Sequence, residues 1–257
     1  MPTIHPTAVI DNKAELADNI TVGPFTVIDG DVKIDSGSRI DSHVYIADGA
    51  RIGKKCHIHH GSVIATIPQD LKFDNEKTVL EIGDDTEIRE YTTLNRGTSH
   101  RGKSKIGKHC FLMAYTHVAH DCFIGDHCIL ANGVQLAGHV TIEDWVIIGG
   151  LTPIHQFCRI GQHAFIGGGL RVSKDVPPYI LAADSPLTYK GVNIVGLKRR
   201  DFNKESIEVI TRCYRYLYRS KLNISQAVAK IKNDFEELFE IKNILEFIEK
   251  SERGIIK

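Results

Sequence analysis

The sequence predicts a mainly β protein, in which a long solenoid of short strands precedes a small α-helical C-terminal region. An aliphatic residue recurs at every sixth position from Ile4, and between Ile106 and Val172 this series has no gap. A fixed short period is the signature of a solenoid, and six residues suit one short strand and one turn. Beyond Val172 the period decays, and from about Gly191 the apolar spacing is helical.

Three six-residue sides close a triangular coil of eighteen residues, and successive coils stack at roughly 4.8 Å, the spacing of neighbouring strands. The position four residues after each aliphatic residue is small, and it holds five of the six cysteines: Cys56, Cys110, Cys122, Cys128 and Cys158. We expect these cysteines to pack as small buried hydrophobes. No C-x-x-C motif occurs, so the sequence predicts no zinc knuckle or redox motif and favours a reducing cytoplasm.

Two polar segments interrupt the repeat, near residues 65–81 and 95–105. Loops on a rigid scaffold commonly carry binding groups, and a tolerated surface insertion is the alternative interpretation. The tandem prolines at 177–178 are expected to end the coil, because proline continues neither a central strand nor a helix. We therefore expect a coil domain over residues 1–187 and a helical domain over residues 188–257.

Three helical segments are predicted in the C-terminal domain. The first has Asn203 as its N-cap and runs through Leu217, and the second has Ser225 as its N-cap and runs through Leu238. The third contains residues 244–248.

Charge and hydropathy exclude several classes of protein. The chain has 32 basic and 32 acidic residues, so nothing global favours nucleic acid or an anionic membrane. No apolar run reaches the length of a membrane span, and the N-terminus lacks the features of a secretory signal. From Lys190 onward, 15 basic residues stand against 10 acidic ones. A basic C-terminal region can hold phosphates, bind an acidic protein or dock on the acidic coil.

Positions eighteen residues apart fall in one column of the coil, which brings candidate catalytic groups together. One column contains His120, Gly138 and Gln156, and the next contains Asp121 and His139. An aspartate beside a histidine orients the imidazole and stabilises its protonated form, as a general base requires. A glycine amide nearby can stabilise a developing oxyanion. A surface histidine on a turn is the alternative interpretation.

Several short strings occur together and in a fixed order. They are His117-Val-Ala-His120-Asp121-Cys122, Leu136-Ala-Gly138-His139-Val140, Ile154-His155-Gln156-Phe157-Cys158, Asp175-Val-Pro-Pro-Tyr179 and Gly191-Val-Asn193-Ile-Val-Gly-Leu-Lys198-Arg199-Arg200. In this combination the chain resembles, over essentially its full length, the UDP-N-acetylglucosamine O-acyltransferase family, which opens lipid A biosynthesis. Its coil resembles the hexapeptide-repeat, left-handed parallel β-helix, and the handedness is implied by that resemblance alone.

The resemblance implies a role for each matching position. His120 matches the catalytic base, Asp121 its orienting partner, and Gly138 the amide that stabilises the oxyanion. Other positions match groups that bind the sugar nucleotide or line the cleft between subunits: Gln69, Asp70, Lys72, His117, His139, His155, Gln156, Asn193, Arg199 and Arg200. Gly168 matches a position in the groove that measures the acyl chain, and Phe165 is its bulky neighbour.

The enzyme implied by the resemblance is a cytoplasmic homotrimer. It transfers an (R)-3-hydroxyacyl chain from acyl carrier protein to the 3-hydroxyl of UDP-N-acetylglucosamine, without a bound cofactor. Asn95 and Val195 stand where the family commonly has His and Glu, so a sugar nucleotide with a 3-amino group is an alternative acceptor.

Further alternatives come from other classes of protein. The N-acyltransferase of the same pathway usually has an extra N-terminal domain, for which the repeat starting at Ile4 leaves no room. A coenzyme A-dependent acetyltransferase and a non-catalytic assembly scaffold are the other two. The length of the acyl chain is not indicated by the sequence.

Metal catalysis is a rival interpretation of the thirteen histidines. His117 and His120 are three residues apart, and His57, His59 and His60 form a cluster. Gamma-class carbonic anhydrases share this type of coil and bind zinc through histidines that include a pair five residues apart. No two histidines of this chain are five residues apart, so we expect no catalytic metal.

Overall fold

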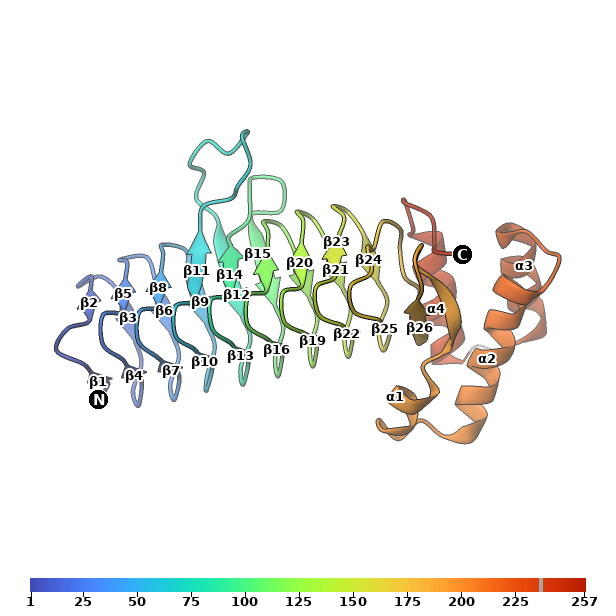
Figure 1. Ribbon diagram of the computed structural model, residues 1–257, viewed down its shortest axis with the longest axis horizontal. Coiled ribbons are helices and arrows are strands. Elements are labelled where there is room, and N and C mark those ends of the chain that lie inside the picture. The colour runs from blue at the N-terminus through green and yellow to red at the C-terminus, as the bar shows by residue number, and fades with distance from the viewer. Residues whose placement is uncertain (236–237) are drawn as a thin grey trace.

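Short parallel strands coil into a long three-sided prism, with a hairpin and helices at its C-terminal end (Figure 1). The structure is a computed structural model that describes residues 1–235 and 238–257. We call the three walls of the prism sheets A, B and C. Successive strands visit A, B and C in turn, so each coil contributes one strand to each wall.

Sheet A consists of β1 (Thr3–Ile4), β4 (Thr21–Val22), β7 (Arg39–Ile40), β10 (His57–Ile58), β13 (Glu87–Ile88), β16 (Phe111–Leu112), β19 (Ile129–Leu130), β22 (Ile147–Ile148), β25 (Phe165–Ile166), β26 (Ile180–Ala183) and β27 (Thr188–Val192). Sheet B consists of β2 (Val9–Ile10), β5 (Val27–Ile28), β8 (Tyr45–Ile46), β11 (Val63–Thr66), β14 (Thr93–Asn95), β17 (His117–Val118), β20 (Gln135–Leu136) and β23 (Pro153–Ile154). Sheet C consists of β3 (Glu15–Leu16), β6 (Lys33–Ile34), β9 (Ala50–Ile52), β12 (Val79–Ile82), β15 (Lys103–Ile106), β18 (Phe123–Ile124), β21 (Thr141–Ile142) and β24 (Arg159–Ile160).

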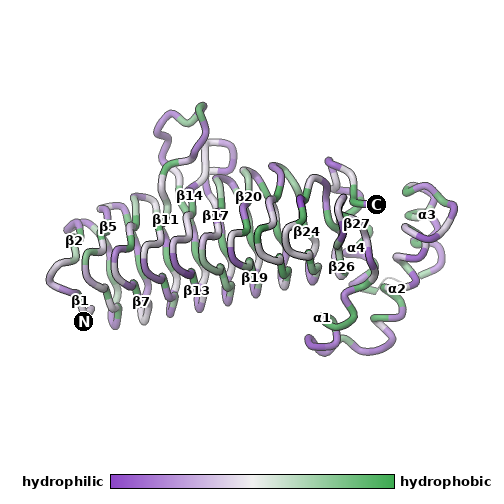
Figure 2. The backbone as a smooth tube through the Cα atoms, viewed as in Figure 1, coloured by the Kyte–Doolittle hydropathy of each residue, from purple (hydrophilic) through white to green (hydrophobic). Residues whose placement is uncertain are grey.

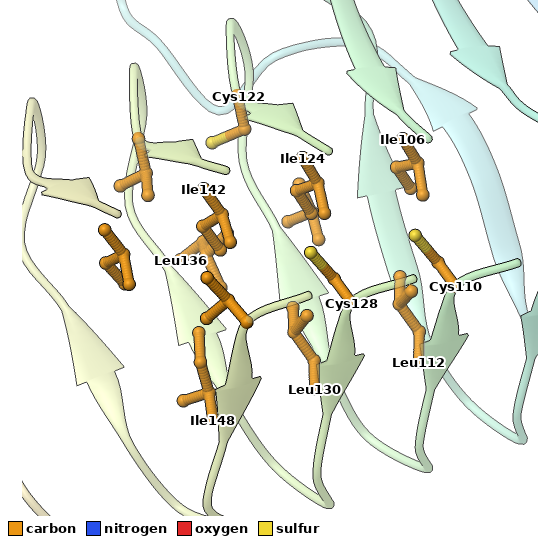
Figure 3. Close-up of a cluster of buried hydrophobic side chains, with 14 of the residues drawn as sticks. Ile106, Cys110, Leu112, Cys122, Ile124, Cys128, Leu130, Leu136, Ile142 and Ile148 are labelled. Atoms are coloured by element: carbon orange, nitrogen blue, oxygen red, sulfur yellow. The ribbon is translucent and has the colours of Figure 1, made fainter. Parts of the chain in front are cut away.

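The aliphatic residue of each repeat points into the prism. Ile124 pairs with Ile142, and Leu130 pairs with Ile148, each one coil further along. Figure 3 shows such side chains filling the interior, and Figure 2 shows the short alternation of hydrophobic and hydrophilic residues along the coil that results. From Ile106 to Val172 every residue of the six-residue series is at most 2% exposed, which confirms the period as the origin of the core.

All six cysteines are buried free thiols, as expected for five of them from their place in the repeat. Burial, the largest effect, raises the pKa of Cys122 to about 12. The thiol therefore stays protonated and packs as an apolar group.

Most corners of the prism are turned by a residue with positive φ, and most of these residues are not glycine. Asp121, His139 and Phe157 have φ values of 57°, 63° and 63° at the corner between sheets B and C. Asp and His accept this left-handed region more readily than most residues. The backbone of the corner thus repeats from coil to coil, so residues at equivalent places form regular columns.

Both insertions leave the coil at the corner between sheets B and C. The first loop, 67–78, connects β11 to β12, and the second loop, 96–102, connects β14 to β15. Both are shorter than the polar segments at 65–81 and 95–105, because the flanking strands continue into those segments by pairing with each other. Lys103 and Ser104, for example, pair with Val79 and Leu80.

The chain after β25 differs from the sequence prediction. β26 adds to sheet A in parallel with β25, and β27 returns antiparallel to β26. Pro177 and Pro178 therefore do not end the sheet; they lie in the connection before β26, where the ladder does not need their missing N–H groups. The predicted boundary at residue 187 falls in the turn of this hairpin, so sheet A continues into the region predicted as helical.

The helices are α1 (Ile194–Lys198), α2 (Lys204–Arg219), α3 (Ile224–Asp234) and α4 (Phe239–Glu249). Asn203 caps α2 by accepting a hydrogen bond from the Ser206 N–H, which confirms that prediction. The prediction of Ser225 as a cap is wrong, because Asn223 forms a reciprocal capping box with Gln226. Of the predicted segment through Leu238, residues 236–237 lie outside the described part of the chain.

Polar contacts join the helices to the last coils. The Tyr214 hydroxyl donates to the Pro178 carbonyl, and the Asn243 side chain donates to the Tyr179 hydroxyl at 3.0 Å. Ser251 donates to the Asp175 carboxylate at 2.6 Å. Within residues 1–235 and 238–257, no helix has the length and apolar character that crossing a bilayer requires.

The capping box of α3 gives a direct test of its observed start. Replacing Asn223 by Ala leaves the first turn without its cap and should cost about 1 kcal/mol of local helix stability. Ser225→Ala, which removes the residue expected from sequence, should cost much less. Hydrogen exchange of the α3 amides in the folded protein compares the two variants, and equal protection in both would contradict the assignment.

Candidate active site

One corner of the prism collects most of the predicted site residues. The two loops leave the coil between sheets B and C, and the next coil turns the same corner through His120 and Asp121, which connect β17 to β18. Gly138 and then Gln156 follow at the same corner, one coil apart. The column predicted from the eighteen-residue spacing is therefore present, with the loops beside it.

His120 and Asp121 form a close pair. The His120 Nδ1 atom lies 2.8 Å from Asp121 Oδ2, and the exposed fractions of the two side chains are 13% and 0%. When Nδ1–H donates to the carboxylate, the lone pair of the neutral imidazole is on Nε2, the nitrogen away from Asp121. The arrangement gives a base that is oriented on one side and open on the other.

The second loop encloses the Asp121 carboxylate. Oδ1 accepts from the backbone N–H groups of Thr98 (3.1 Å) and Arg101 (3.2 Å), and Oδ2 accepts from the Thr98 hydroxyl (2.7 Å) and His120. Burial, the largest effect, raises the pKa of Asp121, but the hydrogen bonds from His120 and Thr98 outweigh it and lower that pKa to about 2. Asp121 is therefore ionised and fixed in place at neutral pH.

These contacts also decide against a metal at this corner. Donor atoms of His120, Asp121 and His139 lie within 4.8 Å of one another, as metal ligands do. A carboxylate has about four acceptor sites, and the four hydrogen bonds of Asp121 use them. Three of these bonds come from the second loop, so a cation could reach the carboxylate only by displacing the bond to His120.

Sequence reasoning missed Thr98 and Arg101. It predicted that their loop carries functional groups. No motif in the sequence indicates which loop residue contacts Asp121, and Thr98 is 23 positions away from it in the chain. Arg101 also donates to the Asp121 carbonyl at 3.0 Å and places its guanidinium 4.7 Å from the Phe123 ring centroid. These contacts hold the loop against the coil that contains the base.

Gly138 lies directly against the His120 ring. A Cβ atom at this position would be 2.7 Å from His120 Cε1 and 2.8 Å from Nε2, so no side chain fits. The Gly138 N–H makes no hydrogen bond with the described residues. A free amide beside the open nitrogen of the base suits a group that stabilises negative charge developing on an oxygen.

His139 and His117 flank this pair. His139 Nδ1 lies 3.9 Å from Asp121 Oδ2 without hydrogen bonding to the described residues, and its ring stacks on Phe157 at 4.5 Å. His117 Nδ1 lies 2.8 Å from the Thr93 hydroxyl. Burial is the main cause that lowers the pKa of both histidines, so both favour the neutral form.

The other predicted residues of this corner are more exposed. Gln69 and Lys72 are exposed on the first loop, two coils before His120, and Asp70 accepts a hydrogen bond from the Lys72 N–H. Gln156 is exposed two coils after His120, and its carbonyl contacts the neighbouring His155 ring.

The residues predicted to hold the UDP end of the nucleotide lie elsewhere in the same chain. Asn193 caps α1 and donates to the His163 carbonyl at 3.0 Å, and the Arg200 guanidinium lies 5.2 Å from the Trp145 ring centroid. Trp145 and His163 turn the corner between sheets C and A. Arg199 is the exposed C-cap of α1. Within one chain these residues are not brought to His120.

The predicted acyl-chain residues lie at a third position. Phe165 is in β25 of sheet A, and Gly168 follows it at the corner between sheets A and B. A Cβ atom at Gly168 would be 3.0 Å from the Gly150 carbonyl oxygen. The three corners of the prism therefore divide the predicted base, nucleotide and acyl-chain residues among them.

The two departures from the family pattern have different surroundings. Asn95 is 2% exposed, and its side-chain amide donates to the Thr66 hydroxyl at 3.0 Å and the Ile67 carbonyl at 3.1 Å. These two hydrogen bonds hold the start of the first loop against the coil. Val195 is 62% exposed on α1 and makes no comparable contact.

Comparisons with known proteins agree along the whole chain. Residues 175–256 match the family described as UDP N-acetylglucosamine O-acyltransferase, domain 2, and residues 31–66 and 103–138 match bacterial transferase hexapeptide repeats. Two relatives are named acyl-[acyl-carrier-protein]--UDP-N-acetylglucosamine O-acyltransferase. The one from Aliarcobacter butzleri is 48% identical over 99% of this chain and 98% of its own length. The one from Thiobacillus denitrificans is 42% identical over 100% of both.

A solved structure extends the agreement to three dimensions. The UDP-N-acetylglucosamine acyltransferase from Bacteroides fragilis is 45% identical, with 98% of this chain and 99% of that one covered and a TM-score of 0.97. The fold class is therefore the predicted left-handed parallel β-helix followed by a small helical C-terminal domain. The chain belongs to the UDP-N-acetylglucosamine O-acyltransferase family.

Proposed function

We propose that this acyltransferase moves an (R)-3-hydroxyacyl chain from acyl carrier protein to the 3-hydroxyl of UDP-N-acetylglucosamine, the first step of lipid A biosynthesis. The substrates follow the names of relatives that match the whole chain. The observation that carries the chemistry is the His120–Asp121 pair with Gly138 against its open side.

The reaction needs one proton acceptor and one oxyanion donor. His120 Nε2 removes the proton from the sugar 3-hydroxyl, and the oxygen attacks the thioester carbonyl of the donor. The Gly138 N–H stabilises the charge on the tetrahedral intermediate. When the carbon–sulfur bond breaks, the His120 imidazolium returns the proton to the departing thiolate, so the base is regenerated. The phosphopantetheine arrives on the carrier protein, and no metal or bound cofactor takes part.

Asp121 acts through His120. Its carboxylate stays ionised because its pKa is lowered to about 2, and it stabilises the imidazolium that forms during the transfer. The bonds from Thr98 and Arg101 stop the carboxylate from rotating away. The second loop therefore positions the base without contacting the reacting atoms.

The chain acts as a homotrimer in this proposal. Apart from Met1 and Ile4, every exposed large hydrophobic side chain of the described coil lies on sheet B or at its two corners. They are Val9, Phe25, Val27, Tyr45, Ile67, Tyr91, Tyr115, Leu151 and Phe157, with Leu71 at the tip of the first loop. Such a face suits burial against another copy. Sheet B also borders the corner of His120, so the partner would close the site.

A shared site accounts for the residues that one chain keeps apart. Arg199, Arg200 and Asn193 lie at the corner between sheets C and A, whereas His120 lies between sheets B and C. In a closed ring of identical chains, the C–A corner of one chain can face the B–C corner of the next. Guanidinium groups pair strongly with phosphates, so Arg199 and Arg200 hold the UDP group for the neighbouring His120.

The acyl chain lies along the outside of the coil, between subunits. Gly168 is three coils beyond His120, about 14 Å at the strand spacing. Its backbone φ is not in the left-handed region, so a side chain at this exposed position costs mainly the close approach to Gly150. A large side chain there would block the far end of the groove.

The cellular setting follows from the partners. Acyl carrier protein and nucleotide sugars are cytoplasmic, and six buried thiols suit a reducing compartment. A hydroxyl acceptor is proposed because the relatives are named O-acyltransferases. A sugar with a 3-amino group is the second candidate, since Asn95 and Val195 depart from the family pattern.

Replacing His120 by Ala should reduce kcat roughly 10²–10⁴-fold, because it removes a general base. The variant should fold normally, since the ring lies outside the core. His5→Ala, in the first coil, is the matched control and should retain most activity. Steady-state rates with saturating substrates measure both, and near-normal turnover of His120→Ala would favour a non-catalytic role for the corner.

Mixed trimers test the shared site. Chains with His120→Ala and chains with Arg200→Ala, co-expressed with different tags and purified as hybrids, each supply the residue that the other lacks. Every hybrid ring of three chains contains about one intact site in three, so kcat/KM at low sugar nucleotide should recover to roughly a third of the wild-type value.

Hybrids of His120→Ala with Asp121→Asn are the negative control, because both residues belong to one corner of one chain. These hybrids should stay as inactive as their parents. If the first pair also fails to recover, each site is built from a single chain.

Replacing Gly168 by Met should shift the preference to shorter acyl chains, because the added side chain fills the groove. The KM for the sugar nucleotide should not change. Gly168→Ala introduces the same Cβ atom without the length, so it reports the cost of crowding Gly150. Rates with a series of hydroxyacyl carrier proteins separate the effects, and an equal loss on all donors in both variants would place the length selection elsewhere.

A further inference from the structure

A second group of histidines lies on the coil, away from the proposed active site. His57 is in β10 of sheet A, and His59 and Asp41 follow β10 and β7 at the corner between sheets A and B. This position is two coils before His120 along the axis and at a different corner. No step of the acyl transfer uses these residues.

The donor atoms of the three side chains lie close to one another. Asp41 Oδ2 lies 3.1 Å from His57 Nε2 and 3.5 Å from His59 Nδ1. All three donor atoms lie within 4.8 Å of one another. In a tetrahedral zinc site with bonds of 2.0–2.2 Å, neighbouring donors are about 3.3 Å apart. The two shorter separations around Asp41, one of which is a hydrogen bond in this structure, are close to the value that a bound ion would impose.

The carboxylate is held so that one oxygen is directed at the imidazoles. Arg39 Nε donates to Asp41 Oδ1 at 2.8 Å, which leaves Oδ2 toward His57 and His59. Asp121 in the active site differs, since hydrogen bonds use both of its oxygens fully. Among the described residues these are the two groups with metal-ligand spacing. Apart from the bonds to their own histidines, Asp41 accepts one hydrogen bond, whereas Asp121 accepts three.

His59 also has the outer partner that metal-binding histidines usually have. Its Nε2 atom lies 3.0 Å from Glu87 Oε1, while Nδ1 faces Asp41. A carboxylate on the second ring nitrogen fixes the tautomer, orients the ring and raises the basicity of the ligand atom. The side chain is only 15% exposed, and the His57 ring lies against it, tilted by 31°, with centroids 3.7 Å apart. The donors are therefore ordered before any ion binds.

We propose that Asp41, His57 and His59 bind one divalent transition metal ion, with zinc as the best fit. Two imidazoles and one carboxylate match the ligand preference of zinc, and three protein ligands leave a position for water. The ligands come from two successive coils, β7 and β10. The ion thus acts as a clamp between neighbouring coils, separate from catalysis.

Zinc binding by the full-length trimer, without a histidine tag and after chelator treatment, tests the proposal. Calorimetry with Zn²⁺ should give one ion per chain, and Co²⁺ should give the visible absorption of a low-coordinate site. Asp41→Asn and His59→Ala should abolish this binding, and Glu87→Gln should weaken it roughly 10–100-fold. Acyl-transfer activity of the Asp41→Asn variant should equal that of the wild type.

A matched control uses another pair of neighbouring histidine rings. His109 and His127 stack at 4.8 Å but belong to no group of three metal donors in the described residues. His109→Ala should bind zinc as the wild type does. The proposal is overturned if the wild type binds no zinc, if Asp41→Asn and His59→Ala bind it unchanged, or if His109→Ala loses it equally.

Discussion

The filling of a narrow three-walled interior is the constraint on which the rest of this structure depends. One aliphatic side chain per six residues fits between the walls, and parallel pairing then places each residue beside the one a coil further along. Because the packing of the interior fixes the strand register, each outward-facing residue lies beside the residues at equivalent places in the neighbouring coils. His120 and Gly138 come together for this reason, and no local turn sequence is needed to aim one at the other.

The same rigidity explains how a buried carboxylate is tolerated. Asp121 is fully buried at a corner, and burial alone would favour its neutral form. The second loop supplies hydrogen bonds from Thr98 and Arg101 that outweigh this effect. A loop inserted one coil earlier thus makes an ionised aspartate stable beside the base. Asp41 accepts only one hydrogen bond besides the contacts with its histidines, so similar residues have different surroundings at the two corners.

The fold could be predicted from sequence wherever the period holds. Counting residues is enough to predict the aliphatic series, the buried cysteines and the column of His120. In a solenoid, residues at a fixed spacing in the sequence occupy equivalent places on successive coils. The hairpin β26–β27 was missed because Pro177 and Pro178 were interpreted as ending the sheet, whereas they lie in a connection. Ser225 was predicted as a cap where Asn223 is the cap in the structure. Both residue types suit that role locally, and only the geometry of the turn distinguishes them. The part of the site formed by Thr98 could not be predicted, because a loop conformation decides which hydroxyl reaches Asp121.

The two ends of the prism are built differently. The C-terminal end is covered by β26, β27 and the helices, but the first coil leaves Ile4 44% and Val9 63% exposed. In a solenoid each coil is stabilised only by its neighbours, so local opening starts at the uncovered end and proceeds coil by coil. His120 is in the sixth coil, well inside the stack. Local opening of the first coils therefore involves turns that carry no catalytic group. The corner that contains His120 keeps its neighbouring coils while the first coils open.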